Sequence, residues 1–151
     1  MGGRRKAREL VLQACYAHEL SQNPPEMILE TLILPSDLEP ANKEFAARLF
    51  RQTVAHVDEF NEYIKGKAAN WELDRIAIID RIVLRMAICE FLYFDDIPPK
   101  VSIDEAIEIA KKYSTENSGR FVNGILDAVL NDLRKSGRLP DPEQDLSQGA
   151  T

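Results

Sequence analysis

Residues 72–94 are apolar in nearly every direction that a helix could present. The apolar positions are Ile76, Ile78, Ile79, Ile82, Val83, Leu84, Met86, Ala87, Ile88, Phe91 and Leu92. The charged residues between them do not alternate with a period of two, which favours a helix over a strand. A helix that is apolar all round has to be enclosed by other elements. The sequence therefore predicts a central buried helix with the rest of the chain packed around it.

The remaining apolar residues recur mostly at helical spacing, three and four positions apart. Ser102 and Glu105 have the spacing of a capping box, and Gly137 is placed to end the last helix. No segment predicts a strand, and no internal repeat is present. The sequence thus predicts an all-α fold, with amphipathic helices over residues 5–20, 41–64, 103–110 and 118–136 and a short helix over 27–34.

A chain of 151 residues fits one domain, or two small subdomains that share a core, and is long enough to bury a hydrophobic interior. We expect a folded domain over residues 1–139 and a disordered, polar tail over 140–151. No stretch approaches the ~20 apolar residues of a membrane span, and the basic start is not followed by the apolar segment of a secretory signal. Cys15 and Cys89 lie inside helical apolar patterns, as buried thiols do. These features predict a cytoplasmic protein with no membrane partner.

The first eight residues carry four cations and no acid, on a chain of net charge −6. At 100° per residue, Arg4, Arg5 and Arg8 fall within an arc of about 100° beside the apolar face of the first helix, while Lys6 points elsewhere. Such a cluster on an acidic body would confine a polyanion to one end of the fold. A solvated terminus explains the same residues.

A second polar and aromatic group lies at the start of the last helix. Phe121 is at the border of the apolar stripe, beside Arg120 and Asn117. An aromatic side chain there could stack an unpaired base while phosphate meets the helix N-terminus. A phenylalanine that caps the edge of the core is the alternative. Gly124, inside the same helix, is interpreted as a site of close helix packing.

Signals for catalysis are weak throughout. His18 and His56 lie far apart on apolar-patterned helices, where core or flanking histidines are the usual case. No phosphate loop, nucleophile elbow or metal-ligand spacing is present. We expect no enzymatic activity, no metal and no cofactor.

Several segments together resemble the NusB transcription antitermination factors. The opening, Arg4 to Glu9 with Leu12, Gln13 and Tyr16, is similar to the start of that family. The second half is similar through Leu84–Ala87 with Glu90, Ile97–Val101, Asp104–Ala106 and Ala110–Lys112. The most specific run is Phe121–Asp127, and the match extends in order over about residues 4–135.

The resemblance implies two small helical bundles packed side by side, over about residues 4–70 and 71–137. It implies a non-catalytic adaptor that binds boxA-type single-stranded RNA in nascent transcripts, notably those of ribosomal RNA operons. It also implies a heterodimer with the ribosomal protein NusE and a link to the elongating RNA polymerase.

Carried onto this chain, the resemblance assigns candidate contacts to two partners. Asn117 stands where related sequences can carry an acid, so we expect a neutral side chain there not to weaken phosphate binding. Asp74 and Asp80 are the candidates for meeting a basic ribosomal protein, although ion pairs inside the bundle explain them equally well. The RNA-binding candidates are Arg4, Arg5, Lys6, Arg8, Gln13, Tyr16, Asn117, Arg120 and Phe121.

Two other functions remain open at this point. A NusB-like domain precedes the catalytic domain of some RNA cytosine methyltransferases, and this chain could be such a domain detached. A purely protein-binding helical module is the second alternative. Self-association of the protein on its own also stays open.

Overall fold

Helices make up all the regular structure of the described chain. The computed structural model describes residues 3–68 and 73–140, and these ranges contain no strand. The all-α prediction is therefore confirmed, while the tail predicted over 140–151 lies, except for Pro140, outside the described residues. The elements are α1 (Gly3–Ser21), α2 (Pro25–Ile28), the π-helical turn η1 (Leu29–Ile33), α3 (Pro40–Ala55), α4 (Val57–Lys65), the 3₁₀ turn η2 (Leu73–Arg75), α5 (Ile78–Tyr93), α6 (Pro99–Tyr113) and α7 (Glu116–Lys135).

The α5 helix is the centre of the molecule, as its apolar composition predicted. Every residue from Ile82 to Phe91 is buried. The helix packs against α1, α3, α4, α6 and α7, so that each of its faces meets another element. The burial of charged residues within this run requires partners for Arg85 and Glu90.

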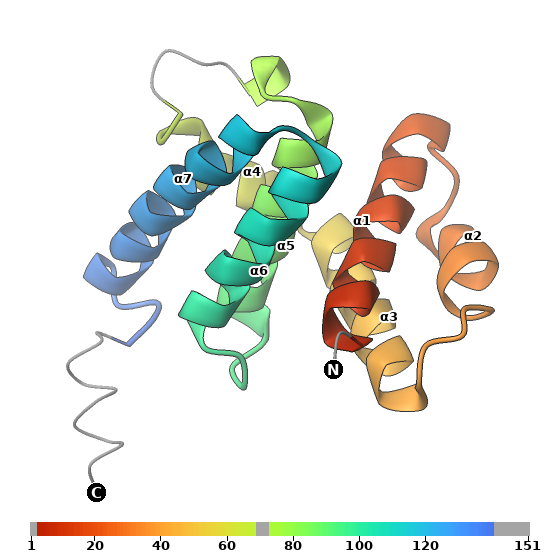
Figure 1. Cartoon of the computed structure of the whole chain (residues 1–151). Helices are drawn as coiled ribbons and strands as arrows, with labels where there is room; N and C mark the ends of the chain where they lie inside the picture. Colours follow the sequence, from red (N-terminus) through yellow and green to blue (C-terminus); the bar gives the residue numbers. More distant parts are fainter. Residues whose placement is uncertain (1–2, 69–72, 141–151) are drawn as a thin grey trace, which may run out of the picture.

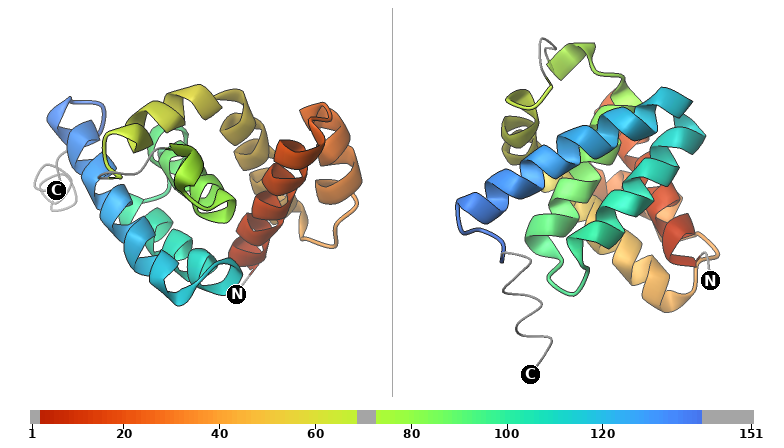
Figure 2. Two further views of the ribbon diagram at one scale, coloured as in Figure 1. Left: turned by 90° about the horizontal axis from the view of Figure 1, so that it is seen from above. Right: turned by 60° about the vertical axis from the view of Figure 1, so that its left-hand side comes forward.

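Two groups of helices lie side by side, as the family resemblance implied (Figure 1). The α1 and α3 helices pack on each other and on α5, with α2 and η1 against α1. The α6 and α7 helices pack together on the other side of α5, and the views of Figure 2 agree. The α4 helix contacts α5 and α7, although the expected boundary near residue 70 would place it in the first bundle.

Several helix boundaries differ from the sequence prediction. The α6 helix begins at Pro99, a favourable first helical residue, so Ser102 lies inside the helix and is not a cap. The capping box belongs to α7 instead, where Thr115 and Ser118 bond reciprocally. The helical pattern over 41–64 is interrupted at His56 between α3 and α4. Gly137 follows α7 with a φ of 82°, as predicted.

Close packing involves Gly119 rather than Gly124. A Cβ at Gly119 would lie 2.8 Å from Cγ of Lys111, on α6. A Cβ at Gly124 would meet nothing within 4 Å, so the interpretation of Gly124 as a packing glycine is wrong. Cys15 and Cys89 are both free and buried, as predicted. Among the described residues, no helix combines the length and apolar character needed to cross a membrane.

Candidate nucleic-acid interface

The first turns of α1 present three exposed cations. Ala7, Val11 and Ala14 are fully buried and fix the inner face of this helix, which leaves Arg4, Arg5 and Lys6 in solvent. The guanidinium of Arg4 lies 4.2 Å from the ring centroid of Phe45 on α3, in a cation–π contact. One face of this guanidinium is thus held in place at the surface of the protein.

Arg5 connects α1 to α6. Its Nε donates to a carboxylate oxygen of Glu105 at 2.6 Å. This hydrogen bond raises the pKa of Arg5 above its ordinary value, which keeps the guanidinium charged. The side chain of Arg5 is 45% exposed and that of Glu105 is 21% exposed, so water screens the pair. A phosphate that approaches Arg5 therefore has to compete with Glu105.

Arg8 does not belong to the exposed group, and the prediction that it faces phosphate is wrong. Only 3% of this residue is accessible, and its Nε and Nη2 donate to the two carboxylate oxygens of Glu90 at 2.9 and 2.8 Å. Ser102 donates a third hydrogen bond to Glu90 at 2.7 Å. A buried carboxylate needs such compensation, so Arg8 holds the fold together and is unavailable to a ligand.

A second contact between α1 and α6 extends this surface. Lys112 and Tyr113 both donate to Glu9, at 3.0 and 2.8 Å. Burial is the main cause that raises the pKa of Tyr113, followed by its hydrogen bond to Glu9, while a hydrogen bond from Gln13 opposes them. Tyr16 is 38% exposed one turn further along α1. Polar and aromatic groups thus continue from Arg5 toward the end of α6.

Phe121 opens onto a cavity at the start of α7. The ring is half-buried, and Asn117 and Arg120 beside it are exposed. The capping box of Thr115 and Ser118 positions this first turn. The cavity has a volume of about 320 Å³ and is lined by Arg75, Ile76, Ala77, Asp80, Thr115, Asn117, Ser118 and Phe121. An accessible aromatic ring at a helix start can stack an unpaired base.

Asp80 is not an exposed protein contact, which corrects its predicted role. It is 6% exposed and accepts a hydrogen bond from Ser118 at 3.0 Å. Its other carboxylate oxygen, Oδ1, is buried and has no hydrogen-bond partner in the described part of the chain. The side chain of Asp74 lies outside the described residues, so its predicted role stays a prediction.

The α6 helix lies between α1, which carries the cations, and α7, which carries Phe121 (Figure 1). Arg5 is hydrogen-bonded to Glu105 on α6. Glu9 is hydrogen-bonded to Tyr113, the last residue of α6. Tyr113 follows Glu105 by eight positions, which is about 12 Å along a helix. The α6 helix thus connects the position that meets Arg5 to the position that precedes α7.

Sequence reasoning missed the contribution of α6 to this surface. Lys112 was part of the family resemblance, but its pairing with Glu9 joins residues 103 positions apart, which periodicity cannot detect.

Across the described residues no cluster of three metal-ligating side chains occurs. His18 lies edge-on to Phe50 at 6.4 Å and His56 stacks on Tyr93 at 4.7 Å, in packing roles.

Comparison with known proteins gives consistent matches over most of the chain. The sequence model of the NusB family matches residues 5–131. The transcription antitermination protein NusB of Salinibacter ruber is 51% identical over 140 residues, which cover 92% of this chain and 88% of that protein. The structure of T. maritima NusB is 43% identical with a TM-score of 0.77, and the match covers 83% of this chain and 89% of that one.

A second solved structure shows the same fold at lower identity. It is a crystal structure of the antitermination factors NusB and NusE in complex with dsRNA. The match has a TM-score of 0.78 at 24% identity and covers 87% of this chain and 98% of that one.

Proposed function

The chain belongs to the NusB family of transcription antitermination factors, and on that premise we propose that it binds boxA-type single-stranded RNA in nascent transcripts, notably those of ribosomal RNA operons. It acts as a non-catalytic adaptor. It binds the RNA together with the ribosomal protein NusE and connects it to the elongating polymerase. Family membership confirms the resemblance that the sequence segments indicated.

The observation that carries this proposal is the surface formed by α1, α6 and the start of α7. Three exposed cations begin it, at residues 4–6, and a half-buried aromatic ring ends it, at Phe121. Without Arg4, Arg5 and Lys6, the remaining charges sum to −9. Phosphate is therefore attracted to this end of the fold and repelled elsewhere.

The role of each side chain along the bound RNA follows from its chemistry. Arg4, Arg5 and Lys6 bind phosphates, which sets affinity and salt dependence. Phe121 stacks a base. Exposed polar side chains beside it read base edges, which sets sequence choice. Those side chains are Gln13, Tyr16, Asn117 and Arg120. Arg8 contributes indirectly, because its pair with Glu90 fixes α1 against α5.

The proposed NusE contact is supported by charge. The acidic body of the chain attracts a basic ribosomal protein without competition from the cationic RNA surface. The similar fold seen in a NusB–NusE–dsRNA complex supports the same partners for this chain. Asp74 remains a candidate contact, whereas Asp80 is excluded because it is buried.

Fluorescence anisotropy with a labelled boxA oligonucleotide and a scrambled one tests the proposal. We expect tighter, salt-sensitive binding to the boxA sequence and a further gain when the NusE-type protein is added. Equal affinity for both oligonucleotides in the presence of that protein would reject boxA recognition. Gel filtration of the two proteins without RNA tests the heterodimer separately, and two unshifted peaks would reject it.

A further inference from the structure

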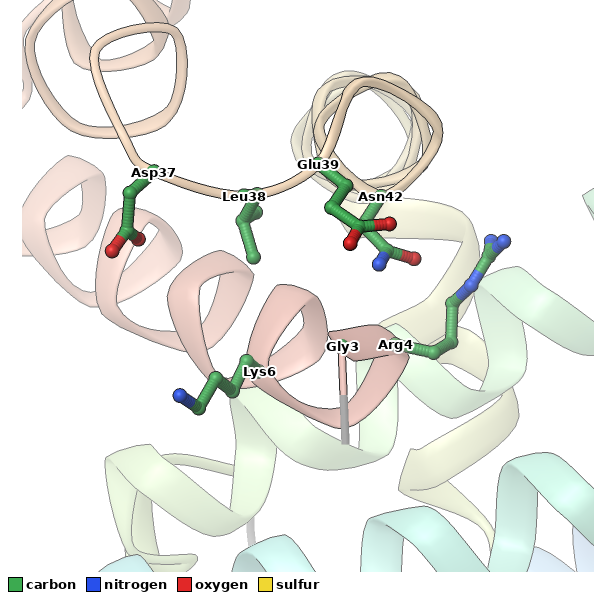
Figure 3. A pocket seen from close by; sticks show the side chains of 7 residues that line it. All are labelled: Gly3, Arg4, Lys6, Asp37, Leu38, Glu39 and Asn42. Atoms are coloured by element: carbon green, nitrogen blue, oxygen red, sulfur yellow. The ribbon is translucent and has the colours of Figure 1, made fainter. Parts of the chain in front are cut away.

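A cavity of about 460 Å³ lies between the start of α1 and the segment that leads into α3 (Figure 3). It is distinct from the cavity beside Phe121, with which it shares no lining residue. Its lining combines cations, carboxylates, an amide and one apolar side chain. The residues are Gly3, Arg4, Lys6, Asp37, Leu38, Glu39 and Asn42.

The charged groups of this cavity do not pair with one another. Lys6, Asp37 and Glu39 make no ion pair and no side-chain hydrogen bond with any residue of the described ranges. Exposed pairs of opposite charge are worth little in water, so side chains in solvent need not form them. Here the space between α1 and the loop keeps them apart. The donors and acceptors of a ligand could therefore meet both signs of charge at once.

Glu39 and Asn42 lie together on one side, and the Leu38 side chain points into the space between the loop and α1 (Figure 3). Glu39 is the N-cap residue of α3, but its side chain makes no capping hydrogen bond, so its carboxylate is not engaged there. A carboxylate only accepts hydrogen bonds, and an amide both donates and accepts. The two carboxylate oxygens of Glu39 thus lie beside the amide of Asn42, which can donate through its NH2 group or accept through its oxygen.

Guanine is the RNA base that fits this arrangement. Its Watson–Crick edge carries two adjacent N–H donors, at N1 and N2, beside the O6 acceptor. Adenine and cytosine place a ring-nitrogen acceptor next to the amino group, and uracil flanks its single N–H with carbonyls. A carboxylate is repelled by each of those acceptors. Selection by a bidentate carboxylate therefore favours guanine over the other three bases.

We propose that this cavity binds a guanine nucleotide. The Glu39 carboxylate accepts from N1 and N2 of the base, and the Asn42 amide donates to O6. Leu38 packs on the ring face, and Lys6 binds the phosphate from the α1 side. The inference deepens the proposed function and rests on it in one respect: the RNA strand that crosses Arg4 and Lys6 would supply the nucleotide. A free guanine nucleotide is the other source of the same chemistry.

The first experiment observes the cavity directly, without RNA. GMP, AMP and CMP are titrated into the full-length protein while NMR records the methyl groups of Leu38 and the side-chain amide of Asn42. We expect GMP to shift both signals in a saturable way and the other two nucleotides to shift them much less. Glu39→Gln should abolish the GMP response. Glu30→Gln, the same change at an exposed site on η1, should leave it intact.

The second experiment identifies the source. Each guanine of a boxA-type oligonucleotide is replaced in turn by inosine, which lacks only the N2 amine. We expect one replacement to weaken binding by about tenfold, the size of one lost base contact. Glu39→Gln should remove that difference and leave the slope of affinity against salt unchanged, because Glu39 binds no phosphate.

The outcomes separate this inference from the proposed function. Salt-dependent RNA binding with no inosine effect, together with no GMP response, would overturn the cavity and leave RNA binding standing. A GMP response with no inosine effect supports the cavity and assigns the free nucleotide as its source. A GMP response in a protein that binds no RNA would remove the proposed function and keep the cavity.

Discussion

Arg8 and Glu90 form a bidentate ion pair in the protein interior, with donor–acceptor distances of 2.9 and 2.8 Å. The side chains are 4% and 2% exposed. Because Ser102 also donates to Glu90, this carboxylate joins α1, α5 and α6 at one point. The α1 helix, which carries the exposed cations, is therefore fixed to the core through Arg8.

Arg8→Met should destabilise the protein by about 3–5 kcal/mol, because it leaves the Glu90 carboxylate buried without its countercharge. Urea unfolding followed by circular dichroism measures the loss. Arg5→Met is the matched control, since it removes an exposed pair whose expected value is about 0.2–1 kcal/mol. A second substitution, Glu90→Leu, should restore much of the stability of Arg8→Met. Equal losses for Arg8→Met and Arg5→Met would contradict the structural role of Arg8.

The misplacement of Arg8 shows what periodicity can and cannot predict. A helical wheel places Arg4, Arg5 and Arg8 on one arc, and that part of the geometry follows from the sequence. The difference between them comes from Glu90, which is 82 residues away in the chain. Asp80 was misjudged for the same reason, because its partner Ser118 lies on another helix.

The fold was more predictable than the surface because the evidence for it is local. The burial of α5 follows from apolar residues on all its faces, whatever surrounds it. The start of α6 was misplaced because Ser102 and Glu105 mimic a capping box while Pro99 begins the helix. The contribution of α6 to the proposed RNA-binding surface requires knowing that it lies beside α1, which local pattern does not supply.

The two glycines of α7 should respond in opposite ways to alanine. Gly124→Ala places a Cβ in open space on an exposed helix position, so we expect a gain of about 0.5–1 kcal/mol in the free energy of unfolding. Gly119→Ala places its Cβ 2.8 Å from Lys111 and 3.3 Å from Ile107, which opposes that gain. Urea unfolding of both variants should show Gly119→Ala as the less stable by about 1 kcal/mol or more. The reverse order would refute the close approach of α6 and α7 at Gly119.

The two thiols should be inert in the folded protein. Burial raises the pKa of Cys15 and of Cys89 from 9.0 to about 12. At neutral pH we expect no reaction with Ellman's reagent until urea unfolds the chain, when both thiols react. The unfolded state loses its thiol protons first as the pH rises. The corresponding stability is therefore present below pH 9.0 and lost as the pH approaches about 12, which urea midpoints across that range should show.

The Phe121 ring should contribute to RNA affinity through stacking. Phe121→Ala is expected to cost about 1–3 kcal/mol in binding, the usual value of one stacked base. Phe121→Tyr keeps the ring and should retain most of the affinity, whereas Phe121→Leu keeps apolar volume without a ring and should lose it. Anisotropy titrations of the three variants, with circular dichroism to verify folding, provide the measurement. If Phe121→Leu binds as tightly as the unchanged protein, the ring packs against the core and does not stack a base.

The ion pair between Arg5 and Glu105 should limit RNA affinity. Glu105 occupies the Nε donor of Arg5 and adds a negative charge beside the path of the strand. Glu105→Gln releases that donor, so we expect RNA affinity at low salt to rise by up to about fivefold, the value of an exposed pair. Arg5→Ala should do the opposite and reduce the slope of log affinity against log salt by about one unit.

A second exposed pair provides the control for this prediction. Glu62 and Lys65 form an ion pair at 3.0 Å on α4, away from the path proposed for the RNA. Glu62→Gln makes the same change in net charge as Glu105→Gln, so it reports what the overall charge of the protein contributes. The effect assigned to Glu105 is the difference between the two variants. Equal gains would show that Glu105 acts only through net charge, and an unchanged salt slope in Arg5→Ala would remove Arg5 from the phosphate contacts.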